Sequence, residues 1–412
     1  MTVATASDIV LGGGLPSYTT VGSTVPVSLT WEKSTTYDLG LDLDFLNNRL
    51  SFSGDYYRRY TTDMYTPSIS LPSVYGTTSP KGNNAELRTT GWELSLTWRD
   101  SFKLGGKPFD YSIKAMVWDN RTVVTKYENA TRSLGTLKGY IQNGGSPSDF
   151  YEGMELGEMW GYTVAGLFRD QADIDSSATH DFTQASDKVT RPGQVKIADL
   201  DHNGNIDPGA FTADDHGDLS IIGNINPHYM FGVNLAANWN GIGLSVFLQG
   251  VMKRDWYPSP DSGYFWGKYA RPFMWVLGIH NYTDDMYSKE KNNWDTAYWP
   301  RMTTYQSNSS YSWTKLLEIP NTRYKQNAAY LRVKNIQVDY TFPKALCQKI
   351  RLGGLKIYLS GENLFTFTPL HKYAPNFDPE ALGYDTDFSS TAGDGYTYPV
   401  LKSVTLGVNI TF

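Results

Sequence analysis

The chain has 412 residues, of which 14% are aromatic and 19% are charged, and its formal net charge is −6. It contains no run of about 18 apolar residues, which excludes transmembrane helices, and no cluster of Lys and Arg, which argues against nucleic acid as a partner. The single cysteine, Cys347, allows neither an internal disulfide nor a cysteine-based zinc site. A β-barrel is compatible with this composition, because only every second residue of a barrel strand has to be apolar.

Residues 1–34 are rich in Gly, Thr, Ser and Pro, and we expect them to form an extracellular loop segment. They show no export signal, so we expect that a barrel in this chain would be the later part of a longer protein, or that its start has been cut away. From residue 35 onward the pattern changes, and apolar and polar residues alternate strictly over residues 37–45. The polar face of this segment carries three aspartates, which are costly in a dry core and natural beside a water-filled lumen.

The same alternation recurs along the chain and predicts nine strands, because a period of two is typical of a strand with one apolar face. These strands occupy residues 37–45, 50–60, 92–98, 109–117, 231–239, 244–248, 331–342, 355–359 and 404–412. In the seventh strand the apolar phase slips between Val333 and Ile336, which predicts a β-bulge. Segment 158–168 also resembles a strand, but we place it within a loop.

The connections between these strands alternate in length. Short turns follow Phe45, Trp98, Trp239 and Phe342, and large outer loops occupy residues 61–84, 121–227, 256–327 and 364–400. Aromatic residues gather beside the short turns, as in the interfacial girdles of outer-membrane barrels. The sequence therefore predicts an all-β fold, an antiparallel transmembrane β-barrel with long extracellular loops. A large soluble β-sandwich would explain only the alternation.

We expect the two faces of these strands to meet different surroundings. The residues predicted to face lipid are Tyr37, Leu39, Leu41, Leu43, Trp92, Leu94, Leu96, Val404, Leu406 and Val408. The residues predicted to face the lumen are Asp38, Asp42, Asp44, Glu93 and Asn409. Nine strands cannot close a wide barrel, so we expect residues 404–412 to need a further neighbour.

Several short stretches in this order resemble one family. They include Leu29–Tyr37 (LTWEKSTTY), Gly91–Leu96 (GWELSL), Tyr151–Met154 (YEGM), Tyr330–Asn335 (YLRVKN) and Ser360–Phe365 (SGENLF). In order and spacing they are similar to the SusC/RagA family of TonB-dependent outer-membrane transporters of Bacteroidetes. The resemblance implies a plugged barrel of about 22 strands, of which residues 35–412 would form the C-terminal portion, about nine strands.

The resemblance also implies a function and partners. It implies TonB-dependent import of glycan fragments or oligopeptides across the bacterial outer membrane, together with a SusD-like surface lipoprotein. The TonB complex would act through an N-terminal region that is not seen in this chain. The plug and the remaining strands are not seen in it either. A passive porin-like or structural outer-membrane barrel and an extracellular glycan-binding β-protein are the alternatives.

An acidic segment in the second large loop has the spacing of a calcium loop. Alternate oxygen-bearing side chains suit a hard cation, Gly204 permits the sharp turn, and Ile206 stands where such loops anchor to a core. The candidate ligands are Asp199, Asp201, Asn203, Asn205, through its backbone carbonyl, and Asp207. The twelfth position is Ala210, so a last ligand would come from Asp214, Asp215 or Asp218. A solvated acidic turn is the alternative.

The third large loop is dense in aromatic residues. Its rings could stack on a substrate or contact a partner, or they could simply pack the loop. The candidates for contact are Tyr264, Trp266, Tyr269, Trp275, Trp294 and Trp299. The chain has no H-E-x-x-H, G-x-S-x-G or P-loop motif, so we expect neither an enzyme nor an organic cofactor.

Overall fold

The computed structural model describes most of the chain. The described residues are 2–5, 17–20, 29–67, 81–134, 150–180, 190–258, 262, 265, 285–301, 320–382 and 400–412. No helix among them is long and apolar enough to span a membrane. Residues 1–34 contain a pair of short strands, β1 (Thr2–Thr5) and β2 (Ser17–Thr20), where the sequence predicted only a loop.

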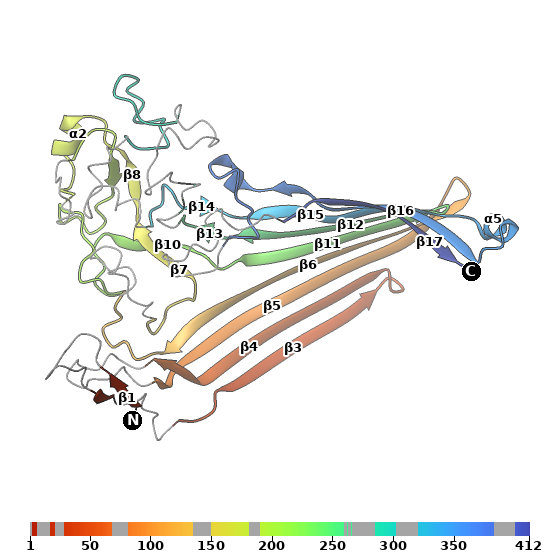
Figure 1. Cartoon of the computed structure of the whole chain (residues 1–412), viewed down its shortest axis with the longest axis horizontal. Coiled ribbons are helices and arrows are strands. Elements are labelled where there is room, and N and C mark those ends of the chain that lie inside the picture. Colours follow the sequence, from red (N-terminus) through yellow and green to blue (C-terminus); the bar gives the residue numbers. More distant parts are fainter. Residues whose placement is uncertain are drawn as a thin grey trace.

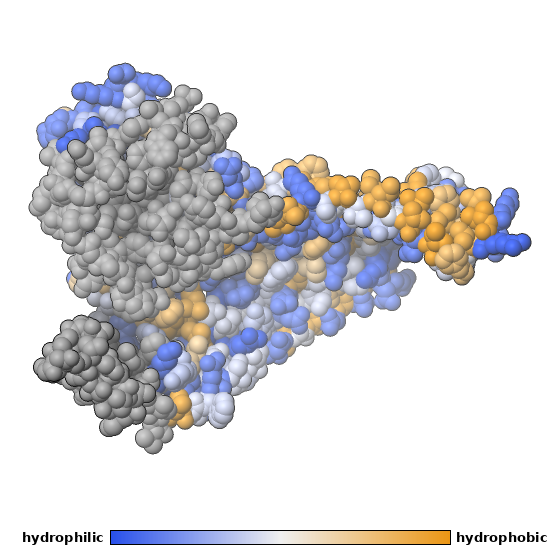
Figure 2. Space-filling view, in the orientation of Figure 1, coloured by the Kyte–Doolittle hydropathy of each residue, from blue (hydrophilic) through white to orange (hydrophobic). Residues whose placement is uncertain are grey.

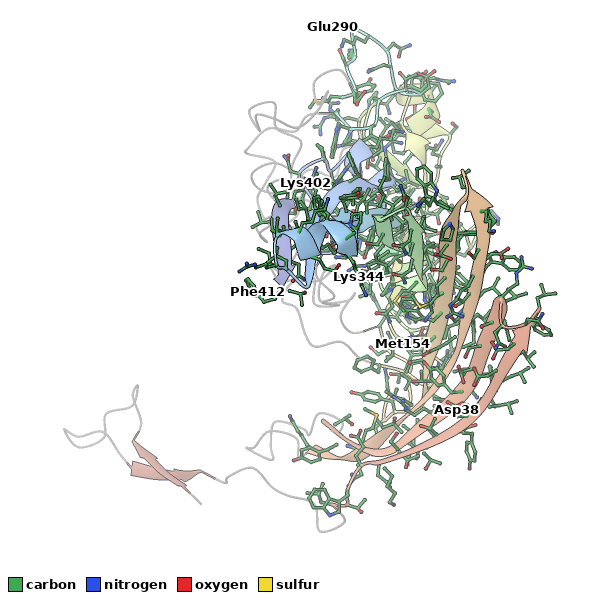
Figure 3. The ribbon with its side chains drawn as sticks, turned by 90° about the vertical axis from the view of Figure 1, so that its right-hand side faces the viewer. Asp38, Met154, Glu290, Lys344, Lys402 and Phe412 are labelled. Atoms are coloured by element: carbon green, nitrogen blue, oxygen red, sulfur yellow. The ribbon has the colours of Figure 1, made fainter. Side chains whose placement is uncertain are left out.

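A single antiparallel sheet of nine strands forms the long axis of the molecule (Figure 1). Its strands are β3 (Lys33–Phe45), β4 (Leu50–Pro67), β5 (Lys81–Leu104), β6 (Lys107–Lys126), β11 (His228–Trp239), β12 (Ile242–Lys253), β15 (Tyr330–Thr341), β16 (Gly354–Phe367) and β17 (Ser403–Thr411). Each of these strands pairs with the preceding and following member of this set, so the order is β17-β16-β15-β12-β11-β6-β5-β4-β3. The nine predicted strands are confirmed, and the sheet curves without closing (Figure 3).

Several strands extend beyond their predicted ends. β4 continues to Pro67 and β5 begins at Lys81, so the first large loop is shorter than residues 61–84. Likewise β6 extends to Lys126 and β16 to Phe367, into the predicted loops 121–227 and 364–400. The backbone ladder continues there although the apolar alternation has ended, because hydrogen-bonded pairing does not depend on an apolar face.

The predicted β-bulge is confirmed in β15. The register against β16 shifts between Val333 and Asn335, and the register against β12 shifts between Phe247 and Leu248. The bulge accounts for the slip of the apolar phase, because one extra residue reverses the alternation that follows it.

Cross-strand pairing joins the alternating residues into two continuous faces. On one face Leu41 lies opposite Gly54, which lies opposite Leu94, and Leu359 lies opposite Leu406. This face is open to its surroundings: Leu39 is 75% exposed and Leu406 is 73% exposed. An exposed apolar surface of this extent is unfavourable in water and is typical of a face that contacts lipid or another protein. Figure 2 shows part of it as a stripe of apolar residues toward the end that carries β16 and β17.

The other face of the sheet is polar. Asp55 lies opposite Glu93, Asp42 lies opposite Ser53, and Asn409 lies opposite Lys356. Lys356 forms a salt bridge with Asp339 on the neighbouring strand, with 2.9 Å between Nζ and Oδ2. The predicted division of residues between two opposite faces therefore holds along the sheet.

The two ends of the sheet differ. At one end the connections are short, and the turn between β15 and β16 contains helix α5 (Lys344–Lys349). Aromatic residues meet there: the rings of Phe102 and Phe109 lie 5.0 Å apart, and those of Tyr340 and Phe342 lie 4.9 Å apart. These pairs contribute to the predicted girdle.

At the other end the described parts of the large loops form a compact body (Figure 1). Its elements are β7 (Glu158–Tyr162), β8 (Val164–Leu167), α2 (Gln171–Asp175), β9 (Val195–Ile197), β10 (Leu219–Asn224), β13 (Asp255–Trp256), β14 (Gln326–Asn327) and the 3-10 helix η3 (Pro369–Lys372). β7 pairs with β10 and β8 with β9, outside the nine-stranded sheet, as the placement of segment 158–168 predicted. The main hydrophobic core of the described residues lies in this body and not in the sheet.

Candidate functional site

The aromatic residues of the third large loop form the centre of the outer body. Trp299 is only 2% exposed and stacks on Tyr324, with 5.6 Å between ring centroids and 17° between ring planes. Phe265 meets Trp299 edge to face at 5.3 Å. Trp294 is partly buried against the same core. Trp299 therefore packs the loop in this structure, and a substrate would not reach it.

The other predicted contact residues cannot be placed in the same way. Tyr264, Trp266, Tyr269 and Trp275 lie outside the described residues. Among the six candidates, then, the structure describes only two: Trp299 lies in the loop core and Trp294 packs against it.

Residues of the second, third and last large loops meet in this core. Tyr298 stacks on Tyr373 of the last large loop, with 3.6 Å between centroids and 4° between planes. The Asn321 Nδ2 donates a hydrogen bond to the Tyr257 hydroxyl at 2.7 Å. Burial raises the pKa of Tyr298, so its hydroxyl stays protonated and acts as a hydrogen-bonding group. The rings thus hold the outer loops in one arrangement.

Two arginines tie the last large loop to the sheet and to its neighbours. The Arg332 Nη2 on β15 lies 2.5 Å from Asp378 Oδ1, and its Nη1 pairs with Glu380. The Arg254 guanidinium donates to the carbonyl oxygens of Pro379 (2.8 Å) and Leu382 (3.0 Å). We call Arg332, Arg254 and the segment 378–382 the arginine latch. Sequence reasoning missed it, because its partners are far apart in the chain.

A second buried polar contact joins β6 to β11. The His228 Nδ1 donates to Asp119 Oδ1 at 2.8 Å, and both side chains are buried. Its Nε2 lies 3.6 Å from Glu155 Oε1, in the loop that follows β6. The second large loop begins after β6 and ends before β11, so this contact holds its two ends together.

The predicted calcium loop brings carboxylates together. Ligand oxygens of Asp199, Asp201 and Asp218 all lie within 4.8 Å of one another. Among the three possible last ligands, the described structure brings Asp218 into the cluster. Asp214 points elsewhere and pairs with Arg132. Gly204 has a positive φ of 84° at the sharp turn, and Ile206 is fully buried, as the pattern predicted.

The remaining predicted ligands surround this cluster. The Asn203 Nδ2 donates to Asp201 Oδ2 at 3.0 Å and to Asp207 Oδ2 at 3.1 Å. The Asn203 Oδ1 accepts from the backbone N–H of Asn205 at 2.7 Å. The loop therefore folds around its own acidic side chains, with an amide group between two of the carboxylates.

The charge of the cluster is incompletely balanced. Asp218 is fully buried, and its carboxylate accepts from the backbone N–H groups of Leu200 (2.6 Å) and Asp207 (2.9 Å). Burial raises the pKa of Asp218 despite these two hydrogen bonds, and the negative charges of Asp201 and Asp199 raise it further. Asp199 Oδ1 is buried without a hydrogen-bond partner among the described residues. A hard cation is the kind of group that such oxygens accommodate.

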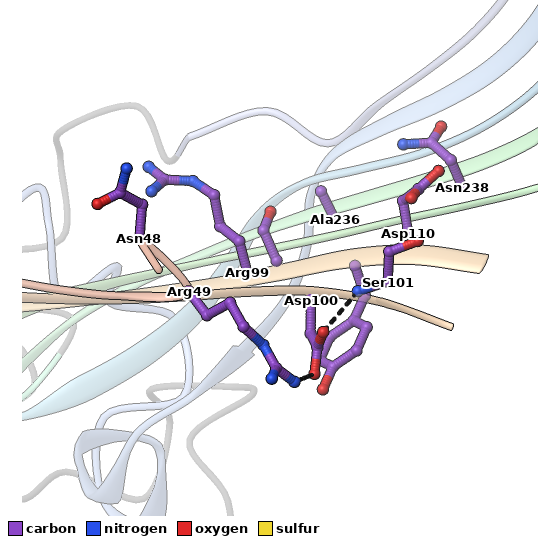
Figure 4. A pocket seen from close by; sticks show the side chains of 10 residues that line it. Asn48, Arg49, Arg99, Asp100, Ser101, Asp110, Ala236 and Asn238 are labelled. Atoms are coloured by element: carbon purple, nitrogen blue, oxygen red, sulfur yellow. Dashed lines mark hydrogen bonds and ion pairs between the residues drawn. The ribbon is translucent and has the colours of Figure 1, made fainter. Parts of the chain in front are cut away.

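A cavity of about 520 Å³ lies at the short-turn end of the sheet (Figure 4). Arg49 pairs with Asp100 at its edge, and Asp100 Oδ1 also accepts from the backbone N–H of Ser101 at 2.8 Å. The lining residues are Asn48, Arg49, Arg99, Asp100, Ser101, Asp110, Tyr111, Ser112, Ala236 and Asn238. A lining of charged and amide groups suits water and ions better than an apolar ligand.

Comparison with known proteins agrees with this architecture. The model of the family "TonB dependent receptor-like, beta-barrel" matches residues 5–190. The chain is 27% identical over 396 residues to TonB-dependent receptor P3 of Formosa agariphila, covering 93% of this chain and 34% of the relative. It is 24% identical over 400 residues to TonB-dependent receptor SusC of Bacteroides thetaiotaomicron, covering 93% of this chain and 32% of SusC. The chain thus spans about a third of the length of these curated relatives.

Solved structures show the same fold. The RagAB peptide importer in its "open-open" state superposes with a TM-score of 0.66 at 19% identity, covering all of this chain and 38% of that one. The "closed-closed" state gives a TM-score of 0.61 at 20% identity. The matched family is one of receptors. The chain is thus similar to TonB-dependent receptors of the SusC/RagA type, and its nine-stranded sheet has the fold of part of their β-barrel.

Proposed function

We propose that the protein carrying these strands imports glycan fragments or oligopeptides across the bacterial outer membrane. In this proposal a SusD-like surface lipoprotein covers the outer loops, and the TonB complex supplies the energy. The observation that carries the proposal is the nine-stranded meander with one exposed apolar face and one polar face, and the similarity to TonB-dependent receptors supports it. Such a sheet suits a wall between lipid and an aqueous lumen.

The two alternatives make different demands on the molecule. An extracellular glycan-binding protein would not carry exposed Leu39, Leu94 and Leu406 on one face, because that face would aggregate in water. A passive porin would have the same wall and would need no energy. The compact outer body favours a receptor, because its buried aromatic core makes a fixed surface for a large partner or substrate.

The experiment is a pair of uptake measurements in the native bacterium. Cells that lack this protein are compared with parent cells for growth on defined oligopeptides and on defined glycans as sole sources. Loss of growth on one class identifies the substrate. The same measurement in cells without TonB should show the same loss. Uptake that persists without TonB would leave the passive barrel as the function.

We also propose that the acidic loop binds one calcium ion. Asp199, Asp201 and Asp218 would supply carboxylate oxygens, and the bound charge would offset their mutual repulsion. Support comes from the convergence of these groups, the unpartnered Asp199 Oδ1 and the loop spacing. Asn203, Asp207 and the Asn205 carbonyl would complete the site after small rearrangements. The ion would order the loop and leave the barrel wall unchanged.

Limited proteolysis with and without a chelator tests the calcium proposal. Calcium should slow cleavage within residues 170–225 of the parent protein and of Asp214→Asn, whose carboxylate is exposed and pairs with Arg132. It should not protect Asp218→Asn or Asp199→Asn. Saturation at about 100 times the dissociation constant would add about 2.7 kcal/mol of local stability. Equal cleavage in calcium and in chelator would mean that the loop is a solvated acidic turn.

A further inference from the structure

The turn between β15 and β16 exposes apolar and basic side chains side by side. Leu346 on α5 and Ile350, four residues later, share one side of the turn and are 46% and 56% exposed. Cys347, next to Leu346, is instead buried, with its Sγ beside the Phe342 carbonyl oxygen. The helix therefore packs its cysteine side inward and leaves its leucine side open.

The same turn is strongly basic. Residues 340–361 contain four cations and no Asp or Glu. Lys356 is paired with Asp339, whereas Lys344, Lys349 and Arg351 are exposed and form no salt bridge with a described residue. Three cations close together repel one another, so an anionic partner would stabilise this arrangement.

The turn between β5 and β6 repeats this pairing at the same end of the sheet. Phe102 and Leu104 are exposed apolar residues, and Lys103 and Lys107 are exposed cations without a salt bridge to any residue that the structure describes. The combination thus occurs in two of the short turns, which Figure 1 places at the same end of the molecule as the C-terminus.

The basic turn that contains α5 lies directly beyond the apolar face of the sheet. Tyr340 and Val338, on the strand that leads into α5, are exposed on the apolar face, as are Ile357 and Val408 on the strands beyond it. Figure 3 shows Lys344 and Phe412 close to the same end. If the apolar face lies in the hydrocarbon layer, α5 lies at the level of the headgroups.

We propose that the surface formed by Lys344, Leu346, Lys349, Ile350 and Arg351, which we call the α5 surface, binds anionic phospholipid headgroups of the adjoining leaflet. The two apolar side chains enter the headgroup–acyl boundary, and the three cations contact phosphate groups. A lipid fits better than a soluble acidic protein, because the apolar pair is continuous with the lipid-facing strands. The proposal rests on the placement of the sheet in a bilayer, which is part of the proposed function.

The test measures lipid binding by the intact protein, purified in detergent and placed in nanodiscs. Nanodiscs of phosphatidylglycerol and of phosphatidylcholine are compared by native mass spectrometry for lipids that stay bound to the protein. The parent should retain phosphatidylglycerol in preference to phosphatidylcholine. The variant Lys344→Gln/Lys349→Gln/Arg351→Gln should lose this preference by roughly 100-fold, since each Lys or Arg near an anionic surface contributes about 1 kcal/mol.

A matched variant removes the same charge at the opposite end of the strands. Arg121, Lys126 and Lys253 are exposed at the outer-loop end, and Arg121→Gln/Lys126→Gln/Lys253→Gln should keep the parent preference. A further variant, Leu346→Ser/Ile350→Ser, should weaken retention of both lipids. Equal preference in the parent and the α5 variant, or an equal loss in both charge variants, would overturn the proposal. Failure of the protein to stay in any bilayer would instead refute the proposed membrane function.

Discussion

Replacing Arg332 by Met should release the last large loop from the sheet. Arg332 is 3% exposed, and the carboxylates of Asp378 and Glu380 that it pairs with are 8% and 17% exposed. Burial alone would raise the pKa of Asp378, but hydrogen bonds from the Glu380 backbone N–H, Arg332 and the Val400 backbone N–H hold that pKa below its usual value. Removing the arginine therefore leaves a buried carboxylate in its charged form without its cation.

The loss of stability depends on which contacts of Asp378 and Glu380 remain after Arg332 is removed. Removing one partner of a buried ion pair costs about 3–5 kcal/mol. The lower end applies here, because Lys334 still lies 2.9 Å from Glu380 and the two backbone N–H groups still reach Asp378. A cost of about 3 kcal/mol corresponds to roughly 100-fold faster opening of the latch segment.

Hydrogen–deuterium exchange of the segment 369–382 measures this opening. In the parent, the amides of Ala374 and Phe377 are protected by hydrogen bonds to Leu370 and Ala374. They should exchange roughly 100-fold faster in Arg332→Met, and much less so in Lys334→Met, which removes a more exposed cation with one carboxylate partner. Unchanged exchange in Arg332→Met, or equal acceleration throughout β15 and β16, would refute the latch.

Two further predictions concern the outer body and the wall. Burial holds the pKa of His180 at about 4 instead of 6.5, with Nε2 accepting from the Ile197 N–H at 2.9 Å. Between pH 6.5 and pH 4 the His180 imidazole is protonated in the unfolded loop and neutral in the folded loop. The free energy of unfolding of the loop should therefore fall by on the order of 3 kcal/mol over this range. Urea titrations measure this fall, and His180→Gln should remove most of the pH dependence. Leu94→Lys should destabilise the protein in a bilayer by about 2–4 kcal/mol, whereas Ser95→Lys on the polar face should have little effect. Equal effects of these two substitutions on unfolding in lipid would contradict the assignment of the faces.

The strands could be predicted because their signal is local. Residues 404–412 alternate without a break, and the observed strand covers Ser403–Thr411. The bulge near Val333 was also visible, since a slip of phase shows in the sequence itself. The strand ends were not. β5 begins at Lys81, and its first residues have no apolar face to mark them, because outside the hydrocarbon layer both faces of a strand can be polar.

The outer body was predictable only in part, because its contacts join distant segments. The spacing of Asp199 and Asp201 identified the acidic loop, but it left three candidates for the last carboxylate, of which Asp218 lies beside these two in the structure. Composition does not distinguish an aromatic ring that packs within a loop from one that contacts a substrate or partner. Trp299, a predicted contact residue, lies in the core. Arg332 carried no signal, since its partners follow in another loop and no spacing rule connects them.

The location of the hydrophobic core has a consequence for how this protein responds to its environment. The outer body buries its aromatic rings away from water, whereas the sheet leaves its leucines exposed, to lipid in the proposed function. The stability of the outer body therefore depends on water, and the stability of the sheet depends on the surrounding lipid. Urea and cold act on the hydration of buried apolar groups, so they should act first on the outer body, while a change in lipid thickness should act first on the wall. The outer body can thus vary in stability and shape while the nine-stranded sheet that carries it keeps its register.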